Sequence, residues 1–173
     1  MKFKITLKVD RKHGDLLPFN YQYEQSAVIY RILAQADTQY SSWLHENGYL
    51  LHERKRFKLF CYSPFIFEKV RPLPEEGCLK IIGERAVWYI SFISEKSTLE
   101  FIQGIFAHQS FSIGNKKYQV AFDVVGVEAM PMPQLSEGMT FVALSPICVK
   151  LHEDNKTQYL SPDNPMFAEG VLK

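Results

Sequence analysis

The sequence lacks most features of secreted, membrane-spanning and metal-binding proteins. Its 173 residues include three cysteines, Cys61, Cys78 and Cys148, which lie far apart and form no CxxC pair. An odd number at this spacing argues against a disulfide framework and against a zinc site. The first residues, MKFKITLKVD, alternate charged and apolar side chains, unlike a signal peptide, and no apolar run approaches membrane-spanning length. We therefore expect a protein of the reducing cytoplasm with no membrane partner.

Common catalytic motifs are also absent. There is no GxSxG, no Walker motif and no paired carboxylate arrangement, and the glycines form no phosphate-binding loop. We expect neither a metal nor another cofactor, because the histidines other than His45 show no metal-ligand spacing and are expected to be structural or exposed: His13, His52, His108 and His152.

The formal charge of +1 conceals a local basic cluster. Between Gly48 and Arg71 two acidic residues face six basic ones, which are Arg54, Lys55, Arg56, Lys58, Lys69 and Arg71. A concentrated patch of this kind attracts an anionic partner more than the total charge does. Interleaved aromatic side chains offer surfaces on which unpaired bases could stack. The alternatives are a solvated charge run and aromatic residues that belong to the core.

Apolar periodicity predicts the order of the elements. Lys2–Val9 alternates apolar and mostly basic residues, which is typical of a half-buried strand. Helical spacing predicts a helix over about Gln22–Gln35 and a shorter one that is capped by Asp37 and ends near Asn47–Gly48. A third helix is expected over Glu95–His108, after Ser94 as its cap.

Turn residues divide the rest of this region into strands. The expected strands are Phe57–Tyr62, Phe65–Val70, Leu79–Ile82, Val87–Ile93 and a hairpin of Ser110–Ile113 with Tyr118–Val127; Asp10–Asn20 is expected to be a loop. The order β-α-(α)-β-β-α-β predicts an α+β, ferredoxin-like fold, with an antiparallel sheet and helices on one face.

The chain is expected to contain one whole domain and part of another. Residues 1–128 form the predicted ferredoxin-like domain, and the Pro-rich residues 129–138 form a linker. Residues 139–173 begin a second ferredoxin-like domain, with a strand over Met139–Leu151, a second strand over Thr157–Leu160 and the start of a helix. They cannot close a core alone, so we expect most of this domain to be missing. The edge of Phe141–Val149 is expected to pair with the first domain or with a second copy, which predicts a possible homodimer.

Three side chains carry the chemistry of a candidate site. With about 100° per residue, Tyr30 lies roughly 130° from the apolar stripe of its helix and His45 roughly 150° from that of the next. Lys58 follows in the basic region. Cleavage of RNA without metal needs a base, an acid and a cation near the phosphorane, and an imidazole, a phenol and an ammonium supply them. That Tyr30 and His45 are ordinary surface side chains remains the alternative at this point.

The sequence resembles the CRISPR-associated endoribonuclease family of the RAMP superfamily, which cuts precursor CRISPR RNA within its repeats. The resemblance is densest in MKFKITLKV, LPFNYQYEQSAVIYRIL, WLHE followed by RFKLFCYS, and TFVALSPICVKL. It implies two tandem ferredoxin-like domains, CRISPR repeat RNA as partner, and metal-independent cleavage to a 2′,3′-cyclic phosphate and a 5′-hydroxyl. It also implies that Tyr30, His45 and Lys58 are the catalytic residues. The basic cluster supplies the expected RNA-binding residues, which are Arg54, Lys55, Arg56, Lys69 and Arg71.

The resemblance has two departures. The loop between LHE and KLF is longer here, so Lys55 is a rival of Lys58 and His52 a rival of His45. The family also has a glycine-rich, RNA-binding segment in its second domain, whereas this sequence stops at Lys173. We therefore expect the 173-residue chain to bind RNA weakly and to have reduced or no cleavage activity. A non-catalytic module that holds repeat RNA in a CRISPR effector complex is the second hypothesis.

Overall fold

The computed structural model describes residues 1–51, 55–140, 142–143, 146–153 and 156–172. The chain divides into two compact units, Met1–Met132 and Pro133–Lys173, and each is described here by itself. Among the residues that the structure describes, no helix combines the length and apolar character needed to cross a bilayer.

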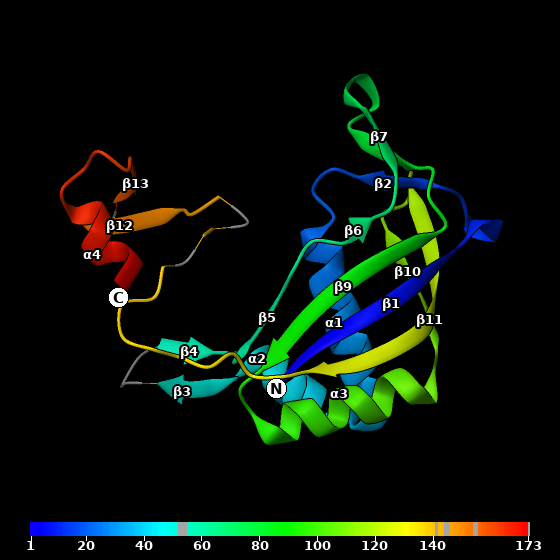
Figure 1. Cartoon of the computed structure of the whole chain (residues 1–173), viewed down its shortest axis with the longest axis horizontal. Coiled ribbons are helices and arrows are strands. Elements are labelled where there is room, and N and C mark those ends of the chain that lie inside the picture. The colour runs from blue at the N-terminus through cyan, green and yellow to red at the C-terminus, as the bar shows by residue number, and fades with distance from the viewer. Residues whose placement is uncertain (52–54, 141, 144–145, 154–155, 173) are drawn as a thin grey trace. The chain divides into compact units, whose positions relative to one another are not determined.

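Unit 1 is built on an antiparallel sheet whose strands come from distant parts of the sequence (Figure 1). The order across the sheet is β10-β11-β1-β9-β5, and β6 also pairs with β9. The strands are β1 (Lys2–Asp10), β5 (Phe60–Tyr62), β6 (Ile66–Phe67), β9 (Arg85–Phe92), β10 (Ser110–Gly114) and β11 (Gln119–Met130). The first and third strands of the β-α-β-β-α-β unit therefore lie in the centre, which is the ferredoxin-like arrangement. The fold predicted from the sequence is confirmed.

Three helices, α1 (Gln22–Ala36), α2 (Thr38–Glu46) and α3 (Glu95–Ala107), occupy one side of this sheet (Figure 1). The alternate residues of β1 and β9 that face the helices are buried, and they include Ile5 and Trp88. The apolar stripe of α1 meets them, with Ile29 and Leu33 fully buried. The predicted caps are present, because Asp37 Oδ1 accepts from the backbone N–H of α2 and Ser94 Oγ from that of α3.

The packing of α3 against α1 depends on Gly104. A Cβ at this position would lie 1.8 Å from the carbonyl oxygen of Ile32. Only a residue without a side chain permits the two helices to approach so closely. Unit 1 is thus held by a tight helix pair laid on an apolar sheet face.

Two small sheets and two 3₁₀ turns extend the core. One sheet has the order β2-β8-β7 and the other pairs β3 with β4. Their strands are β2 (Leu16–Pro18), β3 (Tyr49–Leu51), β4 (Lys55–Phe57), β7 (Val70–Leu73) and β8 (Cys78–Ile81), and the turns are η1 (Arg11–His13) and η2 (Pro74–Glu76). The expected loop at Asp10–Asn20 therefore contains a strand, because β8 offers a pairing edge that the sequence pattern does not reveal.

The strand expected over Phe57–Tyr62 is interrupted. Residues Lys58 and Leu59 belong to no strand, and Leu59 has a φ of 56°. The reason is that β4 pairs with β3 whereas β5 pairs with β9, so the chain must turn between two ladders. This turn places Lys58 between the small hairpin and the main sheet.

Unit 2 contains β12 (Val149–Glu153), β13 (Lys156–Leu160) and α4 (Met166–Leu172). The two strands pair, and α4 packs on β12 so closely that a Cβ at Gly170 would lie 2.3 Å from Val149 Cγ1. The strand predicted over Met139–Leu151 is wrong in its first part, because the described residues of 139–148 are not in a strand. The ladder with β13 ends at Val149, opposite Leu160, so the residues before it have no partner there. The edge on which the homodimer prediction rested is thus absent from the described residues.

The boundary of the first unit also differs slightly from the predicted one. Strand β11 continues to Met130, two residues beyond the expected end at Glu128, because β1 pairs with it as far as Lys2. The assignment of residues 139–173 to the start of a second ferredoxin-like domain stays a prediction.

Candidate active site

Tyr30 and His45 come from consecutive helices whose junction is held by two hydrogen bonds. Asp37 joins α1 to α2 in an extended conformation, and its Oδ1 accepts a hydrogen bond from Tyr40 N at 2.8 Å. The buried Ser41 donates from Oγ to the carbonyl oxygen of Tyr30 at 2.8 Å. The start of α2 is therefore attached to α1 at the residue that carries the phenol.

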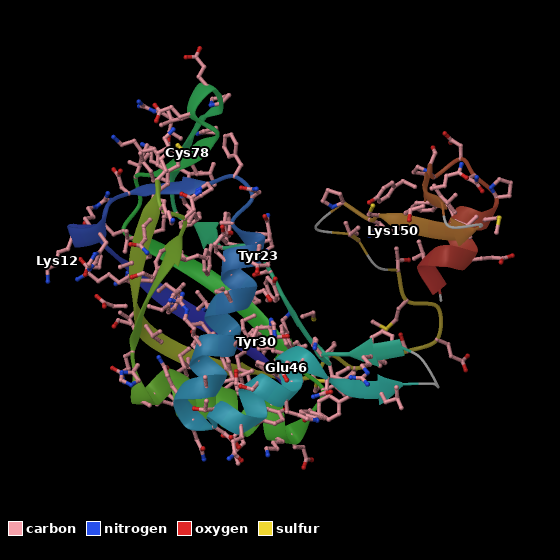
Figure 2. The ribbon with its side chains drawn as sticks, turned by 180° about the vertical axis from the view of Figure 1, so that it is seen from behind. Lys12, Tyr23, Tyr30, Glu46, Cys78 and Lys150 are labelled. Carbon is pink, nitrogen blue, oxygen red and sulfur yellow. The ribbon has the colours of Figure 1, made fainter. Side chains whose placement is uncertain are left out.

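The structure brings the two rings together. The centroids of the Tyr30 and His45 rings lie 4.9 Å apart at an interplanar angle of 84°. Figure 2 shows Tyr30 beside the end of α2, where Glu46 is labelled. His45 is exposed in the last turn of α2, whereas Tyr30 is half-buried and also meets the ring of Phe60 at 5.8 Å. The pair forms one surface with an exposed imidazole and a half-buried phenol.

The phenol of Tyr30 is held in its neutral form. Burial raises its pKa above the ordinary value, and the neighbouring Tyr62 raises it further. At neutral pH Tyr30 is therefore a hydrogen-bond donor and not a base. This agrees with the expectation that a tyrosine orients or donates, while the imidazole is suited to accept a proton.

Lys58 reaches the same end of α2 through its ammonium group. Its Nζ donates to the carbonyl oxygens of Leu44 and His45, which belong to the last turn of the helix. A cation at a helix C-terminus is also favoured by the helix dipole. Burial lowers the pKa of Lys58, and the charge of Arg56 lowers it further. An ammonium has three donors, and the residues that the structure describes accept two of them.

Gly48 makes room for this lysine. It has a φ of 69°, and a Cβ there would lie 2.8 Å from the carbonyl oxygen of Phe57 and 3.2 Å from Lys58 Cδ. The sequence marks Gly48 only as a helix end, and it gives no sign of the part that Ser41 plays. A glycine after an asparagine signals a helix C-terminus, but no sequence signal shows which side chain crosses it.

The predicted RNA-binding residues do not form one patch. Arg56 is exposed next to Lys58 and donates from Nη1 to Asn47 Oδ1 at 3.0 Å. Lys69 and Arg71 are exposed at β7, which Figure 1 shows at the opposite end of unit 1 from α2 and β4. Arg54 lies outside the described residues, and so does the Lys55 side chain.

Two other points bear on the chemistry. The rival imidazole, His52, also lies outside the described residues. Among the residues that the structure does describe, there is no group of three or more His, Cys, Asp or Glu side chains arranged to hold a metal ion. The described groups that converge are a phenol, an imidazole and an ammonium, a set suited to proton transfer and to binding an anion.

The fold defines an α+β protein of the ferredoxin-like class, and Tyr30, His45 and Lys58 form a candidate site at the end of α2. Residues 16–123 match the family described as CRISPR-associated protein Cas6, N-terminal (Cas6_I-A). The chain belongs to this family.

Curated relatives agree with this assignment. The chain is 27% identical over 172 residues to the CRISPR-associated endoribonuclease Cas6 1 of Methanocaldococcus jannaschii, covering 97% of this chain and 62% of that protein. It is 26% identical over 164 residues to the CRISPR-associated endoribonuclease Cas6 of Pyrococcus furiosus, covering 94% of this chain and 57% of that one. The chain thus spans about three fifths of the length of these relatives.

Solved structures share the fold. A Cas6-related protein from Pyrococcus furiosus superposes with a TM-score of 0.76 at 24% identity, over 99% of this chain and 66% of that chain. A structure described as a RAMP protein binding different RNA substrates gives a TM-score of 0.74 at 24% identity, over 99% and 67%. These two likenesses concern the fold alone.

Proposed function

We propose that this protein is an endoribonuclease that cuts precursor CRISPR RNA within its repeats, and that the Tyr30–His45 pair with Lys58 is its active site. The observation that carries the proposal is the edge-to-face contact of the two rings at 4.9 Å, together with the Lys58 ammonium bonded to the backbone carbonyl of His45. The proposal is also supported by two relatives that are named CRISPR-associated endoribonucleases.

The proposed reaction is an in-line attack by the ribose 2′-OH on the adjacent phosphorus. His45 takes the 2′-OH proton while the new bond from O2′ to phosphorus forms. The bond from phosphorus to O5′ breaks, and the Tyr30 phenol transfers its proton to the leaving oxygen, which departs as a 5′-hydroxyl. The phenolate then takes back a proton from the His45 imidazolium, so the proton of the 2′-OH ends on the 5′-hydroxyl. The other product end is a 2′,3′-cyclic phosphate.

Lys58 has an electrostatic role in this scheme. Its remaining N–H donates to a nonbridging oxygen of the phosphorane, where negative charge develops. The carbonyls of Leu44 and His45 hold the ammonium in place before the RNA arrives, so no reorganisation is needed at that moment.

Incubation of the purified protein with end-labelled repeat RNA in EDTA tests the proposal. We expect one cut within the repeat, a 5′-hydroxyl on the downstream fragment and a cyclic phosphate on the upstream fragment. Cleavage that needs a divalent cation would contradict the mechanism. Binding of repeat RNA without any cut would instead support a non-catalytic RNA-binding module.

A further inference from the structure

A pocket in unit 1 lies on the other side of α2 from His45. It is a cavity of about 420 Å³ formed by α2, β3 and the start of α3, and its lining residues are Asp37, Gln39, Tyr40, Trp43, Tyr49 and Lys96. Pockets that hold small ligands typically measure ~300–1,000 Å³. With about 100° per residue, Trp43 lies about 160° around α2 from His45. The cavity is therefore distinct from the Tyr30–His45 surface.

The inner wall of this pocket is aromatic. Trp43 stacks on Tyr40 with ring centroids 5.8 Å apart and meets Tyr49 edge-on at 5.1 Å. Trp43 is nevertheless 39% exposed, which is unusual for a tryptophan with two ring contacts. An exposed indole fixed on two sides is a platform on which a further flat ring can stack.

Hydrogen bonds make this wall rigid. The Tyr40 hydroxyl is bonded to Ser97 Oγ and, at 2.9 Å, to the Tyr49 hydroxyl, which in turn is bonded to Ser94 Oγ at 2.6 Å. Burial raises the pKa of Tyr40 to about 12, so the Tyr40 hydroxyl stays protonated at neutral pH. A wall that is ordered before the ligand binds loses little conformational freedom on binding.

The rim of the pocket carries charge. Lys96 Nζ lies 4.6 Å above the Tyr40 ring and 3.7 Å from Asp37 Oδ2. Figure 1 shows that the start of α3, which bears Lys96, lies beside α2 and β3. An exposed ammonium next to a flat apolar platform combines a phosphate contact with a stacking surface, and the side chains of Asp37 and Gln39 can bond to a base edge.

We propose that this pocket holds one unpaired nucleobase of the RNA substrate, stacked on Trp43, with Lys96 on a neighbouring phosphate. The inference rests on the proposed function, because an RNA lying across α2 would meet both surfaces. An α-helix with its side chains is ~10–12 Å across, so the captured base belongs to a nucleotide near the scissile phosphate. The pocket thereby fixes the register of the strand at the Tyr30–His45 pair.

The two tryptophans provide a direct assay. Trp88 is fully buried, so a change in tryptophan fluorescence on ligand binding reports Trp43. Single-stranded repeat RNA should quench this fluorescence in a His45→Ala protein, while anisotropy of a labelled RNA measures total binding. Adenosine monophosphate serves as a second probe and separates a base in an RNA chain from a free nucleotide. We expect quenching by the RNA at concentrations where the mononucleotide has little effect.

Substitutions test the same contact by affinity. Stacking of one base on an aromatic side chain corresponds to an affinity change of about 5- to 140-fold. Trp43→Leu should weaken RNA binding within that range, and Lys96→Gln should weaken it less. Tyr23→Ala and Lys116→Gln, which change exposed side chains outside the pocket, should leave it unchanged. If Trp43→Leu does not fold, the affinity of Lys96→Gln and the quenching in the His45→Ala protein decide.

The outcomes separate the two proposals. RNA binding seen by anisotropy with unchanged fluorescence, or with unaltered affinity of the two pocket variants, overturns the pocket proposal and leaves the cleavage proposal intact. Quenching by the mononucleotide but not by the RNA overturns it as well. A protein that binds no repeat RNA at all overturns both.

Discussion

The substitution Gly48→Ala gives a quantitative test of how Lys58 is placed. Gly48 has a φ of 69°, and a methyl group there would meet the Phe57 carbonyl oxygen at 2.8 Å and Lys58 Cδ at 3.2 Å. The change therefore introduces two separate costs. One is the left-handed conformation of a residue with a Cβ, and the other is the displacement of a backbone carbonyl and of the lysine stem.

Gly77 isolates the first cost. Its φ is 65°, but a Cβ there has nothing within 4 Å. The left-handed conformation costs a non-glycine residue ~1–2 kcal/mol, and overpacking adds ~1–3 kcal/mol. We expect Gly77→Ala to lower the free energy of unfolding by ~1–2 kcal/mol and Gly48→Ala by ~2–5 kcal/mol.

Urea denaturation of the two variants measures the difference, provided that the slope with denaturant is unchanged. We also expect Gly48→Ala to slow RNA cleavage with little change in RNA affinity, because Lys58 moves away from the end of α2. Gly77→Ala should cleave normally. Equal losses of stability in the two variants would contradict this placement of Lys58, since the contacts at Gly48 would then be too soft to position the lysine.

Three further substitutions test the frame around the site. Gly104→Ala should lower the stability by ~1–3 kcal/mol or more, because its Cβ would lie 1.8 Å from a carbonyl oxygen of α1. Gly126→Ala should cost less, since the nearest atom to its Cβ is 3.7 Å away. Calorimetry showing the reverse order would contradict the described helix packing. Ser41→Ala removes one donor to the Tyr30 carbonyl and should cost ~0.5–1.5 kcal/mol, whereas the exposed Ser42→Ala should be near neutral. Similar melting temperatures for both variants would show that this hydrogen bond does not hold the helix junction. Tyr30→Phe should lessen the loss of stability above pH 10. The raised pKa of Tyr30 stabilises the fold below the ordinary value of 10.0, and this contribution disappears as the pH rises through the folded pKa. Identical alkaline denaturation of the wild type and the variant would contradict this prediction.

Much of the fold follows from local patterns in the sequence. The alternation in β1, the stripe of α1 and the caps Asp37 and Ser94 each concern neighbouring residues, so they are visible without coordinates. Pairings between short segments are not visible in this way. Strand β2 exists because β8 lies next to it, and the break at Lys58 exists because two ladders meet there.

The candidate site was predictable to a similar extent. The angular positions of Tyr30 and His45 showed that both face away from their own helix stripes, and their meeting needed only a tight junction at Asp37. The sequence does not indicate that Lys58 crosses the end of α2, since this depends on the free space over Gly48. Nor does it separate Arg56 from Lys69 and Arg71, because a charge cluster in the sequence can be divided by a folded sheet.

The most direct test of the account compares His45→Ala with His108→Ala in an assay of repeat RNA cleavage and binding. Both histidines are exposed at or next to a helix C-terminus, but only His45 contacts the Tyr30 ring. The account predicts that His45→Ala lowers the cleavage rate by at least ~10²-fold with RNA affinity retained, and that His108→Ala cleaves like the wild type. Undiminished cleavage by His45→Ala would contradict it.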